Sequence, residues 1–82
     1  MNCEANDCTN LAQVRSPRLE AMAWVDLCLE HSKLYINWLK DEYEDLKKKE
    51  NKSFIEKFNM DTLYCKYQVA LLNYNQVIAS KN

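Results

Sequence analysis

The sequence predicts a mainly helical α+β fold, in which a short N-terminal β-hairpin module precedes a long antiparallel helical hairpin. Helical periodicity begins near residue 29 and runs to residue 80, and a helix-start motif at residues 53–56 divides it. Before residue 29, short apolar runs alternate with polar clusters that contain the only proline and three of the four cysteines. A chain of 82 residues has room for one modest core, so a single domain over residues 1–82 is expected.

The hairpin is predicted from two short runs with β propensity, residues 11–15 and 22–27. Ser16-Pro17-Arg18 lies between them, and proline suits the second position of a turn. Trp24 and Val25 favour a strand in the second run. Because the chain contains no glycine, a tight primed turn is not expected, and the hairpin should be irregular.

Two helices are predicted, over residues 29–52 and 54–80. The first has an apolar stripe at helical spacing, formed by Ile36, Leu39, Tyr43 and Leu46. The second has a longer stripe, formed by Met60, Leu63, Tyr67, Ala70, Tyr74 and Val77. Ser53 and Glu56 fit a capping box at its start. An interruption near residues 59–61 is also expected, since Asn and Asp prefer caps to helix interiors.

Four potential metal ligands form two close pairs with the pattern C-x4-C-x19-C-x2-H, namely Cys3, Cys8, Cys28 and the single histidine, His31. Two ligand pairs separated by a long spacer are typical of tetrahedral zinc sites. Residues 28 and 31 lie on one face of a first helical turn, so their ligand atoms can converge. The alternative is three separately buried cysteines and a surface histidine. Among metals, this ligand set favours zinc.

The redox environment also bears on these cysteines, because secretion would favour two disulfides instead. The N-terminus has no basic segment followed by an apolar run, and no stretch approaches the roughly 20 apolar residues of a membrane span. We therefore expect a cytoplasmic protein with no membrane partner. In a reducing compartment, clustered cysteine and histidine favour a metal ion.

We expect one structural Zn²⁺ per chain, in a zinc module over residues 1–31, and no enzymatic activity. Four protein ligands would leave no open position for water or substrate. Glu30 is the nearest candidate acid or base, but the H-x-E order of zinc deaminases is absent.

The arrangement of loop cysteines, a hairpin and a C-x2-H motif that opens a helix resembles a treble-clef zinc finger. The run from Val25 to His31 is similar to the LC-x-x-H closing segment of small phage and archaeal zinc proteins. The resemblance covers about residues 1–35 and implies ligand roles for Cys3, Cys8, Cys28 and His31. Treble clefs serve DNA binding, protein binding and nuclease chemistry, so the fold does not imply one function. The catalytic histidines of the HNH nucleases have no counterpart here.

The second helix is apolar nearly all round, which predicts a protein-binding surface or a homodimer through the helical hairpin. The expected contact residues are Trp38, Tyr64, Tyr67, Leu71, Leu72, Tyr74 and Ile78. Abundant Asn and Lys without glycine suit an AT-rich genome, as in many phages. We therefore expect a small phage accessory protein that acts in the host cytoplasm to inhibit or redirect a host enzyme.

The alternative function is a nucleic-acid-binding regulator, with contacts from Arg15, Arg18, Lys33 and Lys40. A formal net charge of −1 disfavours general polyanion binding. Cys65 stands apart from the ligand set, and we expect it to be a small packed hydrophobe rather than a reactive thiol.

Overall fold

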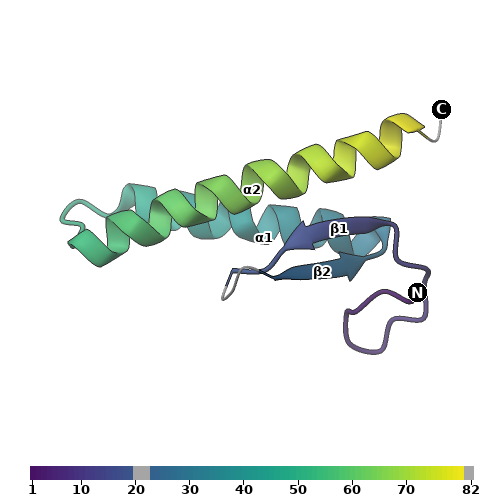
Figure 1. Cartoon of the computed structure of the whole chain (residues 1–82). Helices are drawn as coiled ribbons and strands as arrows, with labels where there is room; N and C mark the ends of the chain where they lie inside the picture. The colour runs from purple at the N-terminus through teal and green to yellow at the C-terminus, as the bar shows by residue number, and fades with distance from the viewer. Residues whose placement is uncertain (20–22, 81–82) are drawn as a thin grey trace.

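The computed structural model describes residues 1–19 and 23–80 and has the predicted α+β, mainly helical architecture. An antiparallel pair of strands, β1 (Val14–Pro17) and β2 (Trp24–Leu27), precedes two helices, α1 (Leu29–Lys48) and α2 (Phe54–Ser80). The helices form an antiparallel hairpin, and the strands lie beside it (Figure 1). Neither described helix is both long and apolar enough to cross a membrane.

The two strands pair from Val14 opposite Leu27 to Pro17 opposite Trp24. The predicted first arm, residues 11–15, is therefore shifted, and Pro17 closes the strand instead of forming the turn. A proline fits here because the end of a strand does not need its missing N–H. Leu11 makes only an isolated bridge with Asn2. The predicted second arm begins at residue 22, which lies outside the described residues.

Helix α1 ends at Lys48, four residues before the predicted end at residue 52. Lys52 lies beyond the helix and bonds to its end. The Lys52 ammonium donates to the carbonyl oxygens of Lys47 and Lys49 at 3.2 and 2.8 Å. A cation bonded to the last carbonyl groups satisfies acceptors that have no partner within the helix. The loop to α2 is consequently longer than the sequence predicted.

Helix α2 is continuous from Phe54 to Ser80, so the predicted interruption near residues 59–61 is wrong. Asn59 and Asp61 are both exposed and lie within the helix. The capping box at its start is confirmed, since the Glu56 amide donates to Ser53 Oγ and the Ser53 amide donates to Glu56 Oε1, both at 3.2 Å. These reciprocal bonds satisfy donors at the start of the helix.

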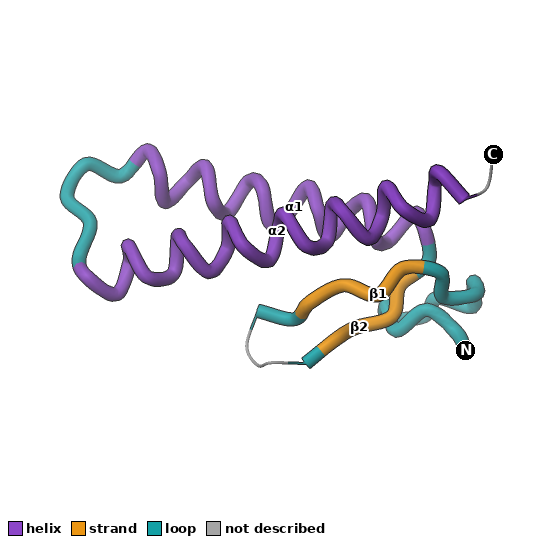
Figure 2. The backbone as a smooth tube through the Cα atoms, turned by 45° about the horizontal axis from the view of Figure 1, so that its top comes forward, coloured by secondary structure: helices purple, strands orange, loops and turns teal. Residues whose placement is uncertain are grey.

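Most of the buried apolar residues lie in two clusters. One lies between the helices and contains Ile36, Leu39, Leu63 and Ala70. The other contains Cys3, Leu27 and Cys28, beside the start of α1. The β-hairpin lies against the helical pair (Figure 2), where the Asn73 side chain of α2 donates a 2.7 Å hydrogen bond to the Arg15 carbonyl oxygen. The second cluster surrounds the candidate functional site.

Candidate metal centre

The structure brings together all four predicted metal ligands. The Sγ atoms of Cys3, Cys8 and Cys28 and a ring nitrogen of His31 lie within 4.8 Å of one another. Cys3 and Cys28 are buried, whereas Cys8 and His31 are half-buried. All three cysteines are free thiols rather than disulfides.

The first ligand pair lies on a closed N-terminal loop. The Cys3 amide donates to the Asn10 carbonyl oxygen at 2.8 Å, and the Cys8 amide donates to the Ala5 carbonyl oxygen at 3.2 Å. Between them, Asp7 adopts a φ of 59°. Aspartate tolerates this left-handed conformation better than most residues. Asp7 therefore provides the tight turn for which zinc knuckles often use glycine.

The second ligand pair lies at the start of α1. Cys28 is the N-cap residue, with φ −70° and ψ 168°, and its carbonyl oxygen accepts the first helical bond from the Ser32 amide at 2.8 Å. Its Sγ accepts a 3.5 Å hydrogen bond from the His31 amide. Because His31 is three residues further along, its ring returns to the same side of the helix as this sulfur.

The spacing of the ligand atoms fits a tetrahedral ion. Zinc bonds of about 2.3 Å to sulfur and 2.0 Å to nitrogen place neighbouring ligand atoms roughly 3.5–3.8 Å apart. In the structure, His31 Nδ1 lies 3.6 Å from Cys3 Sγ and 3.2 Å from Cys28 Sγ, and the Cys8 and Cys28 sulfurs are 3.9 Å apart. These three separations lie near the expected values, and the whole set spans up to 4.8 Å, so the cluster could bind one metal ion after its ligand atoms close in slightly.

The protein environment prepares Cys28 for a metal. The His31 amide that donates to its sulfur lowers the pKa of the thiol to about 6, although burial opposes the shift. At Cys8, the Asn10 amide also lowers the pKa, but burial and the neighbouring thiols outweigh it and leave the pKa raised. With a pKa of about 6, Cys28 is mainly thiolate at neutral pH, and the thiolate is the form that binds a metal.

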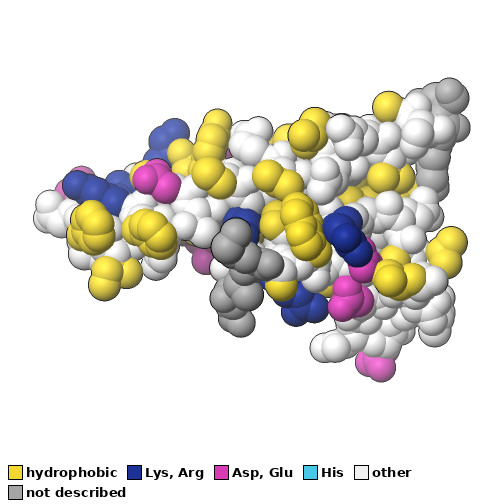
Figure 3. Space-filling view, in the orientation of Figure 1, with side chains coloured by type: hydrophobic (Ala, Val, Ile, Leu, Met, Phe, Trp, Pro, Cys, Tyr) yellow, Lys and Arg dark blue, Asp and Glu magenta, His cyan; other side chains and the backbone are white. Residues whose placement is uncertain are grey.

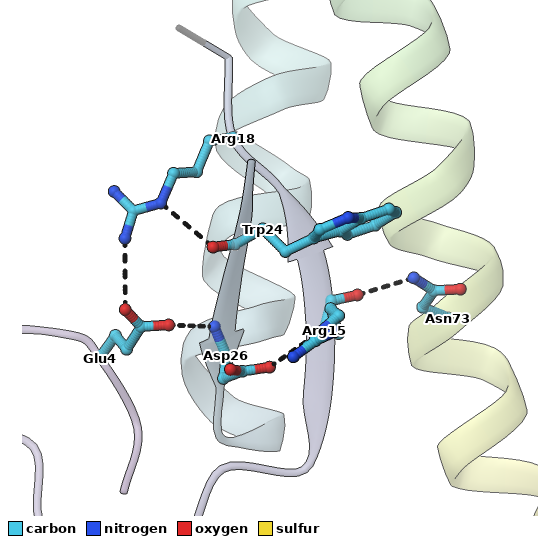
Figure 4. Close-up of polar contacts among 6 residues, drawn as sticks. All are labelled: Glu4, Arg15, Arg18, Trp24, Asp26 and Asn73. Carbon is cyan, nitrogen blue, oxygen red and sulfur yellow. Dashed lines mark hydrogen bonds and ion pairs between the residues drawn. The ribbon is translucent and has the colours of Figure 1, made fainter. Parts of the chain in front are cut away.

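Glu4, next to the first ligand, attaches the N-terminal loop to β2 (Figure 4). Its carboxylate accepts the Asp26 amide at 2.6 Å and the Arg18 guanidinium at 3.2 Å. Its own amide donates to the Asp26 carbonyl oxygen at 2.9 Å.

The Asn10 side chain adds a long contact to Cys28 Sγ, at 3.9 Å. Such contacts around a metal site orient its ligands. No spacing or motif in the sequence singles out Glu4, Asp7 or Asn10, and their one signal is a place in the polar stretch around the first two cysteines.

The four basic residues named for the nucleic-acid alternative differ in their surroundings. Arg15 forms an ion pair with Asp26, and Arg18 forms one with Glu4, each at 3.2 Å. Both arginines project from the β-hairpin (Figure 4). Lys33 and Lys40 are exposed on α1. Two of the four cations are therefore already matched by carboxylates.

The predicted partner-binding residues fall into two groups, those packed in the core and those exposed at the surface. Tyr67, Leu71 and Tyr74 pack against the helical core, whereas Tyr64, Leu72 and Ile78 are exposed on α2. Trp38 is exposed on α1 and stacks on Tyr35, with ring centroids 6.0 Å apart. These two rings line an open groove of about 640 Å³ between the N-terminal loop, the β-hairpin and α1, together with Glu4, Ala5, Arg18, Leu19, Val25, Leu27 and His31.

The prediction that Cys65 is packed is wrong, since its side chain is exposed on α2. The residue lies on the side of the helix away from Leu63 and Ala70, and none of the other elements covers it in the described part of the chain. The β-hairpin packs on another side of α2, where Asn73 donates to the Arg15 carbonyl oxygen, and leaves the Cys65 side open.

Comparisons with protein-family models, with curated proteins and with solved structures found no match to this chain.

Proposed function

We propose that this chain is a small, non-catalytic protein-binding module stabilised by one structural Zn²⁺. The observation that supports it is the convergence of three thiols and one imidazole within 4.8 Å. Zinc accepts such a ligand set in tetrahedral geometry, and four protein ligands leave no position for a reacting water. The ion would connect the N-terminal loop to α1 and so hold the β-hairpin in place.

The groove beside the metal centre is the binding surface that we propose for a protein partner. Trp38 and Tyr35 supply a stacked aromatic wall, and the Arg18–Glu4 ion pair supplies a polar rim. Aromatic residues within a polar rim are the usual composition of a protein interface. Because the metal centre fixes both Glu4 and the start of α1, zinc would set the shape of this groove.

The biological setting that we propose is that of a phage accessory protein which inhibits or redirects a host enzyme. The support is compositional, namely the absence of glycine, the abundance of Asn and Lys, and the small size of the chain. A binding role suits these features, since an inhibitor needs a stable surface rather than a catalytic centre.

Metal analysis and spectroscopy of the purified protein test the zinc proposal. We expect about one zinc per chain, and after exchange with cobalt a visible spectrum typical of tetrahedral coordination by three sulfurs and one nitrogen. Cys28→Ser should lose the metal, whereas Cys65→Ser should keep it. A metal-free protein with four freely titratable thiols and an unchanged fold would overturn the proposal.

Affinity capture tests the binding proposal. The zinc-loaded protein should retain a specific protein from a lysate of its natural host, with little dependence on salt. Trp38→Ala should weaken capture at least tenfold, and Lys40→Ala, an exposed change further along the same helix, should not. Binding to duplex DNA that declines steeply with salt would instead support the nucleic-acid alternative.

A further inference from the structure

Helix α2 has a large apolar surface that the rest of the chain does not cover. Only Leu63 and Ala70 are buried among its 27 residues. Ile55, Phe58 and Leu72 are 69, 64 and 57% exposed. Figure 3 shows hydrophobic side chains at the surface along this helix, in the orientation of Figure 1. A helix that is apolar all round is normally buried on all sides.

The exposed apolar residues are regularly spaced. A stripe that we call the outer seam follows alternating steps of four and three residues: Phe58, Thr62, Cys65, Val69, Leu72 and Gln76. Four of these side chains are exposed apolar or thiol groups, and none of the six is charged. This period is that of a seam between two packed helices. It lies on the opposite side of α2 from the seam that packs against α1.

The outer seam is complementary to itself when a second copy is turned end to end. Centred on residue 67, a two-fold axis places Cys65 opposite Val69 of the second copy, Thr62 opposite Leu72, and Phe58 opposite Gln76. The same operation places Ile55 opposite Ala79. Each pair joins a larger side chain to a smaller one. A parallel alignment would instead oppose Phe58 to Phe58 and Leu72 to Leu72, and leave the small residues facing each other.

The side chains on one flank of the seam also fit this arrangement. There Gln68 lies near the second copy's Gln68, and Asp61 lies near the second copy's Asn75, each pair offset by two residues along the helices, so both contacts can form hydrogen bonds. On the other flank, Lys66 approaches the second copy's Lys66. This single like-charged contact is screened by salt, so added salt should strengthen the association slightly.

The exposed apolar side chains on this face would form the centre of the interface. Ile55, Phe58, Val69 and Leu72 are 69, 64, 37 and 57% exposed, and Phe54 at the start of the helix is 84% exposed. A standard interface buries about 800 Å² per partner, so a stable pair would bury the polar flanks of α2 together with these side chains.

We propose that a second copy of this chain packs on the outer seam of α2 in antiparallel orientation. Two helical hairpins then form a symmetric four-helix assembly, with the two α2 helices at its centre. The proposal does not depend on zinc-mediated binding at the Trp38 groove, which lies among the N-terminal loop, the β-hairpin and α1.

Sedimentation analysis of the full zinc-loaded chain tests the proposal. We expect a species of twice the chain mass at micromolar concentration, and Leu72→Glu should weaken dimerisation at least a hundredfold while circular dichroism stays unchanged. Leu34→Glu is the matched control, because Leu34 is 58% exposed on α1 and should leave the dimer intact. A wild-type chain that stays monomeric at high micromolar concentration, or equal effects of the two variants, would overturn the proposal.

Oxidative cross-linking tests the orientation. In a Val69→Cys variant, the new thiol should form a disulfide with Cys65 of the second copy, identified by mass spectrometry of the linked peptides. Failure of the variant to cross-link, or efficient linkage of Cys65 to Cys65 in the wild-type chain, would contradict the antiparallel register.

Discussion

The phenol of Tyr35 donates a 2.7 Å hydrogen bond to the carbonyl oxygen of Pro17, and this bond joins the second turn of α1 to the end of β1. Burial raises the pKa of Tyr35, so the phenol remains a donor throughout the neutral range. The contact explains why β1 extends through a proline that the sequence placed in a turn. It also connects the β-hairpin to the helix that carries His31.

Tyr35→Phe tests this connection. The variant removes the donor but keeps the ring, so we expect the free energy of unfolding to fall by about 1 kcal/mol, the typical net value of one hydrogen bond. Urea denaturation of the zinc-loaded protein measures it. Tyr43→Phe is the control, since it keeps the ring contact with Tyr64 and should have a smaller effect. Equal losses in the two variants would show that the bond to Pro17 contributes nothing specific.

The Cys28 thiol provides a prediction about pH. Its pKa is lowered to about 6 by the His31 amide, so in the metal-free chain its thiolate favours the folded state. This contribution is complete above the ordinary thiol pKa of 9.0 and is lost as the pH falls through about 6. Ultraviolet absorbance of thiolate should therefore show one group titrating near pH 6. Cys28→Ser should remove that step, and titration of every thiol near its ordinary value would contradict the prediction.

Ser53→Ala should destabilise the start of α2. The substitution removes the acceptor for the Glu56 amide and is expected to cost about 1 kcal/mol. Ser80→Ala, at the other end of the same helix, loses only a bond to the Val77 carbonyl oxygen and should have little effect. Thermal unfolding of the two variants gives the comparison. A larger loss at Ser80 would contradict the role of the capping box.

Two buried serines should behave in the opposite way. Ser16 and Ser32 are fully buried, and neither hydroxyl has a hydrogen-bond partner among the described residues. Removing an unsatisfied hydroxyl removes its desolvation cost, so each alanine variant should be neutral or stabilising by up to about 1 kcal/mol. Calorimetric melting temperatures measure the effect. Losses as large as that of Ser53→Ala would mean that these hydroxyls have partners after all.

The features that could be predicted from the sequence are those that depend on local periodicity or on the spacing of nearby residues. The apolar stripe of the second helix, its start at Ser53–Glu56 and the convergence of Cys28 with His31 all follow from helical geometry within a few residues. The assignment of Cys3 and Cys8 to the same site followed from ligand chemistry, because a tetrahedral metal site needs four ligands in two close pairs.

The remaining features depend on contacts between distant residues. Pro17 lies in a strand because Tyr35 and Trp24 hold it there, and neither is a sequence neighbour. Helix α1 ends early because Lys52 turns back to its last carbonyl groups. Cys65 is exposed because the β-hairpin packs on the Asn73 side of α2 and leaves the outer side of that helix open. No local pattern encodes these outcomes.

The Cys28 sulfur belongs to the candidate metal centre and also accepts the His31 amide in the first turn of α1. A metal ion bound there would share this sulfur with the start of the helix. Folding of the helix and metal affinity are therefore thermodynamically linked, and each must strengthen the other by the same factor. A substitution that favours helix formation anywhere along α1 should tighten metal binding without touching a ligand. Conversely, removal of the proposed metal by a chelator would loosen the first turn of the helix and, with it, the groove beside Trp38.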